Sequence, residues 1–146
     1  MKNMERELIT KWDELLADIN LFLCEHYGYK DSAYLNIQAN GCTLDATSRA
    51  YYLYIRFWEF GGEYRGLPDK IVILVSSTFK KGDQGKQFTN LLRFLKAYAP
   101  IYGYEYITIE DRVDGLDKTC YGFPKTKDPF RPYGPMKIAD LILPDE

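Results

Sequence analysis

The sequence predicts one α/β domain, more narrowly of α+β type, in which helices flank a mixed β-sheet. Three observations carry this prediction. The chain begins with a long amphipathic segment, and segments rich in aromatic and β-branched residues follow it. The pattern of Lys70–Asp111 then predicts a strand, a glycine-bearing loop, an amphipathic helix and a second strand. This last stretch is a β-loop-α-β unit, whose two strands should be parallel. At 146 residues the chain has the length of a single domain, residues 1–146.

A first helix is expected over Lys2–His26. Its apolar residues recur every three or four positions, and charged residues occupy the other side. Gly28 marks its end, because glycine readily adopts the left-handed conformation that closes helices. The apolar positions are Leu8, Trp12, Leu15, Ile19, Phe22 and Leu23. This pattern is typical of a helix packed against a sheet.

Antiparallel strands are expected after the first helix. Ala33–Gln38 alternates weakly between apolar and polar residues, and it ends at the turn-forming pair Asn40-Gly41. Cys42–Ala50 is either a continued strand or a polar loop. Tyr51–Phe60 is rich in the aromatic residues that strands favour. Two or three antiparallel strands would therefore lead into the β-loop-α-β unit.

The β-loop-α-β unit begins at Ile71 with a run of apolar residues, typical of a strand buried on both faces. The strand is expected to end at Val75-Ser76-Ser77. The loop that follows contains Lys81, Gly82, Asp83, Gln84, Gly85, Lys86 and Gln87. Phe88–Ala99 shows helical spacing, and Tyr104–Ile109 is the second strand. Because the loop precedes a helix N-terminus, its amides and the helix dipole favour a phosphate.

The C-terminal part of the chain has a shorter and less regular pattern. Leu116–Cys120 predicts one helical turn, and the prolines of Phe123–Pro135 predict extended or turn geometry. Met136–Leu143 is expected to be the final strand. An exposed edge strand there would allow a homodimer to form by sheet extension.

The β-loop-α-β unit resembles the acyl-CoA-binding core of the GNAT superfamily of N-acetyltransferases. In that family the loop has the pattern (Arg/Gln)-x-x-Gly-x-(Gly/Ala). With Gly85 as the central glycine, Gly82 stands where Arg or Gln is usual, and Gln87 stands where Gly or Ala is usual. Gly103-Tyr104 before the second strand and Tyr121-Gly122-Phe123 further on also resemble the family pattern.

The resemblance, which runs from Ile71 to Phe123, implies a GNAT-like mixed sheet and acetyl-CoA as the acyl donor. In the family, the loop amides hold the pyrophosphate of coenzyme A. The backbone at Val75-Ser76-Ser77 would pair with the pantetheine arm and polarise the thioester carbonyl. Lys86 suits the diphosphate charge, whereas Asp83 opposes it. Without a ligand, the same loop is a solvated connection whose glycines permit the turn.

The acid and base of an acyl transfer have several candidates. Glu59 is placed by analogy as the general base, although it also fits a surface carboxylate. Glu110 and Asp111 compete with it, because ligands in open α/β sheets gather at the carboxyl ends of strands. The tyrosine that the family uses as a general acid falls in register on Lys118. Tyr121 lies nearby and is the candidate for that role.

The composition and net charge of the chain limit the classes of function that it can have. The formal net charge is −2, which argues against a nucleic-acid or anionic-membrane partner. The sequence shows no apolar run of membrane-spanning length and no signal peptide. The odd number of cysteines, Cys24, Cys42 and Cys120, fits a reducing cytoplasm. Asp111, Asp114 and Asp117 fit a solvated loop better than a cation site, so no metal is expected.

Two function classes follow from these observations. The first is an acyl-CoA-dependent N-acyltransferase that moves an acetyl group from acetyl-CoA to an amine of a small molecule or a protein. The second is a catalytically degenerate GNAT-like protein that binds a protein partner, of the kind that a phage or mobile element encodes. The departures of the loop from the family pattern favour the second class, and the order of the elements favours the first.

Overall fold

The computed structural model describes residues 2–28, 33–63, 66–80, 82–110, 118–128 and 133–144, with side chains from residue 11 onward. Its elements are α1 (Lys2–Tyr27), β1 (Ala33–Gln38), β2 (Gly41–Thr47), β3 (Tyr51–Trp58), β4 (Ile71–Phe79), α2 (Gln84–Tyr98), β5 (Tyr106–Ile109) and β6 (Tyr133–Lys137). Three short 3-10 helices, η1 (Ala99–Tyr102), η2 (Lys118–Tyr121) and η3 (Ile138–Asp140), complete the described chain.

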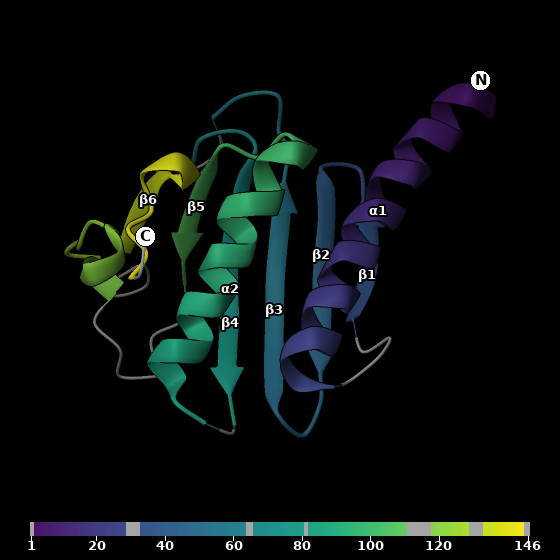
Figure 1. The fold of residues 1–146 in the computed structure, drawn as a ribbon. Coiled ribbons are helices and arrows are strands. Elements are labelled where there is room, and N and C mark those ends of the chain that lie inside the picture. Colours follow the sequence, from purple (N-terminus) through teal and green to yellow (C-terminus); the bar gives the residue numbers. More distant parts are fainter. Residues whose placement is uncertain are drawn as a thin grey trace.

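The strands form a mixed six-stranded sheet whose spatial order, β1-β2-β3-β4-β5-β6, is also the chain order. β1 to β4 are antiparallel, β5 is parallel to β4, and β6 returns antiparallel to β5. Figure 1 shows α1 and α2 side by side on one face of this sheet. The predicted α+β class and the parallel pair of the β-loop-α-β unit are confirmed.

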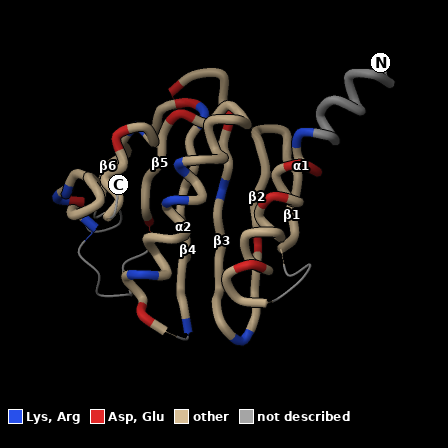
Figure 2. The backbone as a smooth tube through the Cα atoms, viewed as in Figure 1, with Lys and Arg blue, Asp and Glu red and all other residues tan. Residues whose placement is uncertain are grey.

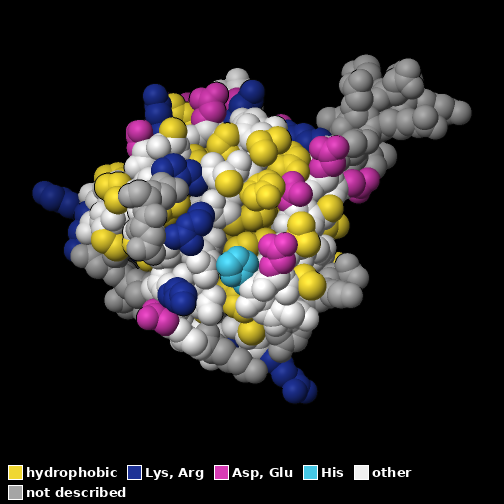
Figure 3. All heavy atoms as spheres, in the orientation of Figure 1, with side chains coloured by type: hydrophobic (Ala, Val, Ile, Leu, Met, Phe, Trp, Pro, Cys, Tyr) yellow, Lys and Arg dark blue, Asp and Glu magenta, His cyan; other side chains and the backbone are white. Residues whose placement is uncertain are grey.

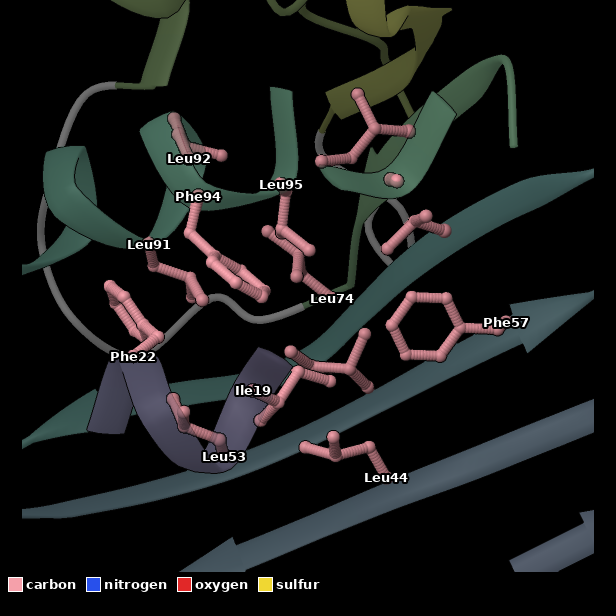
Figure 4. Close-up of a cluster of buried hydrophobic side chains, with 14 of the residues drawn as sticks. Ile19, Phe22, Leu44, Leu53, Phe57, Leu74, Leu91, Leu92, Phe94 and Leu95 are labelled. Carbon is pink, nitrogen blue, oxygen red and sulfur yellow. The ribbon is translucent and has the colours of Figure 1, made fainter. Parts of the chain in front are cut away.

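The core lies between the sheet and the two helices. On β3, Leu53 and Phe57 are buried on the helix side, and they alternate with half-buried residues on the other face. Figure 4 shows Phe57 with Leu44 and Leu74 of the neighbouring strands, and the side chains of both helices beside them. Period-two burial in the strands and the three-to-four spacing in the helices therefore build one apolar layer.

The other face of the sheet carries only a small apolar cluster among the described residues. Leu67, Ile71 and Ile73 are buried there, and Trp58, Val75 and Tyr106 pack against them. Because neither helix covers this face, its strand residues are largely half-buried or exposed. Antiparallel sheets commonly leave one face to solvent in this way.

The expected elements of the first half of the chain are confirmed. α1 extends one residue beyond the expected helix, and its expected core positions from Trp12 onward are buried, while the Leu8 side chain lies outside the described residues. β1 has the expected bounds. The loop of the first hairpin is Ala39-Asn40, so Gly41 is the first residue of β2 rather than part of the turn. The strand alternative holds for the segment after Gly41.

Several predicted strand boundaries are wrong. β2 ends at Thr47 instead of Ala50, β3 ends at Trp58 instead of Phe60, and β5 begins at Tyr106 instead of Tyr104. β4 does not end at Val75-Ser76-Ser77 but continues to Phe79, because Ser76, Ser77 and Thr78 still pair with β3. The final strand is not Met136–Leu143. It is β6, which ends at Lys137, and the chain then turns into η3.

Candidate functional site

The parallel strands β4 and β5 pair over the whole of β5 but only over the first part of β4. Their pairing runs from Ile71 opposite Tyr106 to Leu74 opposite Ile109, and the Glu110 amide then donates a hydrogen bond of 2.9 Å to the Leu74 carbonyl oxygen. β4 continues to Phe79, so its second half keeps β3 as its only described neighbour. The pairing of β4 with β5 thus stops after Leu74, where β5 ends.

A β-bulge lies at this same point. Tyr54 pairs with Ser76 and Ile55 pairs with Leu74, which leaves Val75 as an extra residue in β4. An extra residue bends its strand and re-aims the neighbouring groups, and bulges are frequent beside active sites. Val75 and Ser76 are half-buried here, and Ser77 is buried. The three residues proposed to contact pantetheine therefore lie at the bulge and not at the strand terminus.

The connection from β4 to α2 is shorter than expected. α2 begins at Gln84, so Gln84, Gly85, Lys86 and Gln87 belong to its first turn and not to the loop. Asp83 is the N-cap, and its side chain accepts a hydrogen bond of 3.1 Å from the Lys86 amide. An aspartate at this position starts a helix effectively, which explains the early boundary.

Two glutamines of this first turn have structural partners. The Gln84 amide group donates to the Phe79 carbonyl oxygen and so closes the connection from the end of β4. Gln87 Oε1 accepts a hydrogen bond of 2.7 Å from the Tyr27 hydroxyl at the end of α1. Gly82 has a positive φ of 78°, which explains the glycine at the position where the GNAT pattern has Arg or Gln. Lys81 lies outside the described residues.

The carboxylate of Asp83 bears directly on phosphate binding. It occupies the helix N-terminus, which is where a diphosphate would accept amide hydrogen bonds. A surface pocket of about 410 Å³ lies along the first turns of α2 and contains two basic side chains, Lys86 and Arg93. Its other lining residues are Gly85, Thr89, Asn90, Tyr121 and Pro144. The N-terminus of α2 therefore combines a basic pocket with an acidic cap.

Tyr121 is tied to the first turns of α2. Its hydroxyl lies 2.9 Å from Thr89 Oγ1 and donates to the Gly85 carbonyl oxygen at 3.2 Å. Its ring meets Phe88 edge-on at a centroid distance of 5.3 Å. The structure therefore brings Tyr121 to the wall of the basic pocket, where its hydroxyl holds the helix backbone.

Lys118 is fully buried in η2. Its Nζ lies 5.4 Å from the ring centroid of Phe88 on α2 and 5.9 Å from that of Tyr133 on β6. Buried lysines are rare in proteins. The residue that the resemblance aligns with the family's general acid thus lies between aromatic rings, beside the end of β5.

Two of the three candidate bases, Glu59 and Glu110, follow strands that end at different levels of the sheet, and Asp111 lies outside the described residues. Glu59 follows Trp58, which pairs with Ile71 at the start of β4, whereas Ser76 pairs with Tyr54. Five residues of strand separate Tyr54 from Glu59, roughly 16 Å. Glu110, in contrast, follows β5 directly, where the pairing with β4 stops. Of the two described candidates, Glu110 is the one that lies beside the bulge.

Glu110 has a basic neighbour that the sequence reasoning missed. Arg56 of β3 lies on the face away from the helices, with its Nη1 4.0 Å from Glu110 Oε2. Its guanidinium also lies over the rings of Tyr54 (5.6 Å) and Trp58 (5.4 Å). The period-two order Tyr54, Arg56, Trp58 in the sequence was a signal that these three share a face.

Glu59 belongs to a different cluster beneath α1. Its Oε1 accepts a hydrogen bond of 2.6 Å from Lys11 Nζ. The same Nζ lies 5.3 Å from the ring centroid of Tyr104, whose hydroxyl is buried with no hydrogen-bond partner among the described residues. Burial raises the pKa of the Tyr104 hydroxyl, and the negative charge of Glu59 raises it further. Burial also raises the pKa of the Cys42 thiol to about 12.

The buried thiol gives a pH prediction. Its pKa rises from 9.0 to about 12 on folding, so above pH 9 the unfolded chain releases a proton that the folded chain keeps. The stability due to this group is therefore complete below pH 9 and is lost as the pH rises. We expect the stability difference between the native chain and Cys42→Ala to shrink by about 1.4 kcal/mol from pH 7 to pH 10.

Urea unfolding of both proteins at the two pH values measures this change. The tyrosines that titrate in the same range are common to both chains and cancel in the difference. A stability difference that stays constant with pH would contradict the burial of a neutral thiol at Cys42.

The described residues contain neither a group of metal-binding side chains nor a helix able to cross a membrane. No three His, Cys, Asp or Glu side chains among them are grouped as metal ligands, and Asp111, Asp114 and Asp117 lie outside that part of the chain. Neither α1 nor α2 has the length and apolarity that crossing a membrane requires. The described cysteines form no disulfide; Cys42 is buried and Cys120 is exposed.

Comparison with known proteins adds no relative. No family model matches the chain, and no curated protein or solved structure matches it at a significant level. The geometry of the chain itself is therefore what bears on its function.

Proposed function

We propose that this protein is an acyl-CoA-dependent N-acyltransferase, which transfers an acetyl group from acetyl-CoA to an amine of a small molecule or a protein. One observation carries the proposal: β5 ends level with Leu74, while β4 passes through a β-bulge at Val75 and continues to Phe79, from where the chain leads to the N-terminus of α2. The second half of β4 thus has no described partner strand on the β5 side and leads toward a helix N-terminus. An extended ligand with a phosphate group at one end suits that arrangement.

In this proposal the backbone of Val75-Ser76-Ser77 binds the pantetheine arm. The diphosphate lies at the first turn of α2, with Lys86 and Arg93 of the basic pocket as its counter-charges. Glu110 takes the proton of the acceptor amine as its nitrogen attacks the thioester carbonyl. The carbon–sulfur bond breaks, the coenzyme A thiolate leaves and takes up a proton, and an amide forms. Glu59 stabilises the Lys11 cluster instead of taking part.

A second candidate function rests on a specific observation. Asp83 fills the helix N-terminus, and the Tyr121 hydroxyl is engaged with Gly85 and Thr89, so two groups of an active GNAT-like site have structural roles. A GNAT-like protein that has lost catalysis and binds a protein partner would show these features. Acetyl-CoA binding separates the two candidates.

Isothermal titration calorimetry with acetyl-CoA tests the proposal. We expect micromolar binding by the native chain. Asp83→Asn keeps a capping side chain but removes its charge, so it should tighten binding about three- to tenfold. Gly85→Glu places a carboxylate in the first turn and should weaken binding more than about tenfold. Asp45→Asn, at an exposed position of the otherwise mostly buried β2, is the matched control and should leave the affinity unchanged.

Two results of this titration would contradict the proposal. If the native chain and Asp83→Asn both fail to bind millimolar acetyl-CoA, the acyltransferase proposal is wrong and the binding-module alternative gains. If binding occurs but Asp83→Asn and Asp45→Asn behave alike, the diphosphate does not lie at the start of α2.

A further inference from the structure

A groove runs between α1 and α2 on the outer side of the helical layer. Its volume is about 210 Å³, and it is lined from α1 by Asp18, Leu21 and Glu25 and from α2 by Arg93 and Tyr98. Leu21 is 56% exposed and Tyr98 is 37% exposed. Figure 3 shows hydrophobic side chains exposed along this groove.

The floor of the groove is aromatic. Phe22 of α1 stacks on Phe94 of α2 at a centroid distance of 4.8 Å, and Phe94 stacks on Tyr98 at 4.7 Å. His26 lies against Phe22 at 4.6 Å and continues the row. Exposed apolar surface with a polar rim is typical of a protein–protein contact.

The two rims of the groove carry opposite charges. The acidic side is lined by Asp18 and Glu25 of α1, and the basic side is lined by Arg93 of α2. Figure 2 shows the acidic positions along α1 and the basic positions along α2, and Figure 3 shows the same separation at the surface. A partner that fits this surface must present a basic strip to α1 and an acidic strip to α2.

The chain itself meets that requirement. α1 and α2 are antiparallel neighbours, since Tyr27 contacts Gln87 and Phe22 contacts Phe94. A two-fold axis parallel to the groove lays the acidic α1 of a second copy over the basic α2 of the first, and the reverse contact forms at the same time. An axis across the groove would instead place like charges together. The charge separation thus selects one symmetric arrangement.

We propose that this groove is the interface of a symmetric homodimer, in which α1 of each copy packs on α2 of the other. The two-fold operation preserves height along the groove, so Glu25 of one copy comes within about one helical turn of Arg93 of its partner. Leu21 and Tyr98 become buried at the centre of the contact. The two proposals share Arg93, which lines both this groove and the basic pocket. The oligomeric state therefore tests the dimer, and acetyl-CoA binding by the native chain tests the acyltransferase.

Charge reversal on one rim at a time provides the test. In Glu25→Arg the partner contacts become Arg with Arg, and in Arg93→Glu they become Glu with Glu, so each variant alone should dimerise at least about tenfold more weakly. When the two variants are mixed, both contacts become Arg with Glu. We therefore expect the mixture, and neither variant alone, to recover the dimer.

Sedimentation velocity of the purified full chain over a wide concentration range measures this, at low and at high salt. We expect a native dimer that weakens with salt, and Leu21→Asp should be monomeric with an unchanged circular dichroism spectrum. Tyr34→Asp, an exposed site on β1, is the control and should remain dimeric. A native chain that is monomeric throughout, or variants that do not recover on mixing, would overturn the proposal.

Discussion

Replacing Phe57 by alanine is expected to lower the free energy of unfolding by about 3–5 kcal/mol, because it leaves a cavity the size of a phenyl ring in a close-packed core. Phe57 is fully buried on the helix side of β3, and its ring meets that of Tyr104 edge-on at a centroid distance of 5.3 Å. Figure 4 shows that it lies among side chains of neighbouring strands and of the helices. Urea unfolding monitored by circular dichroism measures the loss.

Tyr52→Ala is the matched control for this substitution. Tyr52 is also an aromatic residue of β3, but it points to the opposite face and is 36% exposed. We expect its removal to cost about 1 kcal/mol, the value typical of a partly exposed strand position. Equal losses for the two variants would show that the helix side of β3 is not the main core.

Gly41→Ala is expected to destabilise the protein by at least about 3 kcal/mol, although it adds only one methyl group. A Cβ atom at Gly41 would lie 1.9 Å from the Phe57 carbonyl oxygen, which is a backbone atom of the paired strand. The φ of Gly41 is +133°, a conformation that L-amino acids rarely adopt. The β2–β3 pairing must therefore shift to accept the alanine.

Gly28→Ala separates the effect of backbone conformation from that of the clash. Gly28 also has a positive φ, +77°, but a Cβ atom there would meet nothing within 4 Å. Its replacement should cost about 1 kcal/mol, from the left-handed conformation alone. Thermal melts of both variants should therefore differ clearly. Similar melting temperatures would contradict the close approach of β2 and β3 at Gly41.

Sequence patterns predicted the strands and helices wherever one periodicity dominated. Trp12, Leu15 and Ile19 recur at helical spacing, and the alternation in Tyr51–Trp58 fits a strand with one buried face. Boundaries failed where pairing with a neighbour overrode local preference. Ser76 and Ser77 have no strong strand preference, yet β3 supplies partners for both.

The last strand illustrates a different limit. Pro135 suggested a break because proline lacks the amide hydrogen that a sheet requires. β6 nevertheless includes it, because β6 is the edge strand and its pairing with β5 is irregular between Ile107 and Ile109. An edge position is a property of the assembled sheet, and the local sequence does not reveal it.

The candidate site could be predicted only in part for the same reason. Asp83 before a helical pattern is a recognisable cap, so its role was within reach of the sequence. The choice between Glu59 and Glu110 was not, because it depends on the register of β3 against β4 and on the direction of β5. The proximity of Arg56 to Glu110 likewise follows from contacts between strands far apart in sequence.

The identity between chain order and sheet order has a consequence for folding kinetics. Each strand pairs with the one that precedes it, so the closure of β1 to β4 needs only short chain segments. Chains with local pairing of this kind close small loops first and fold faster than sheets with long-range crossovers. We expect the meander of β1 to β4 to form before the β4–β5 pair, which must wait for α2. The segment that carries the candidate site then becomes ordered only after the antiparallel meander has formed.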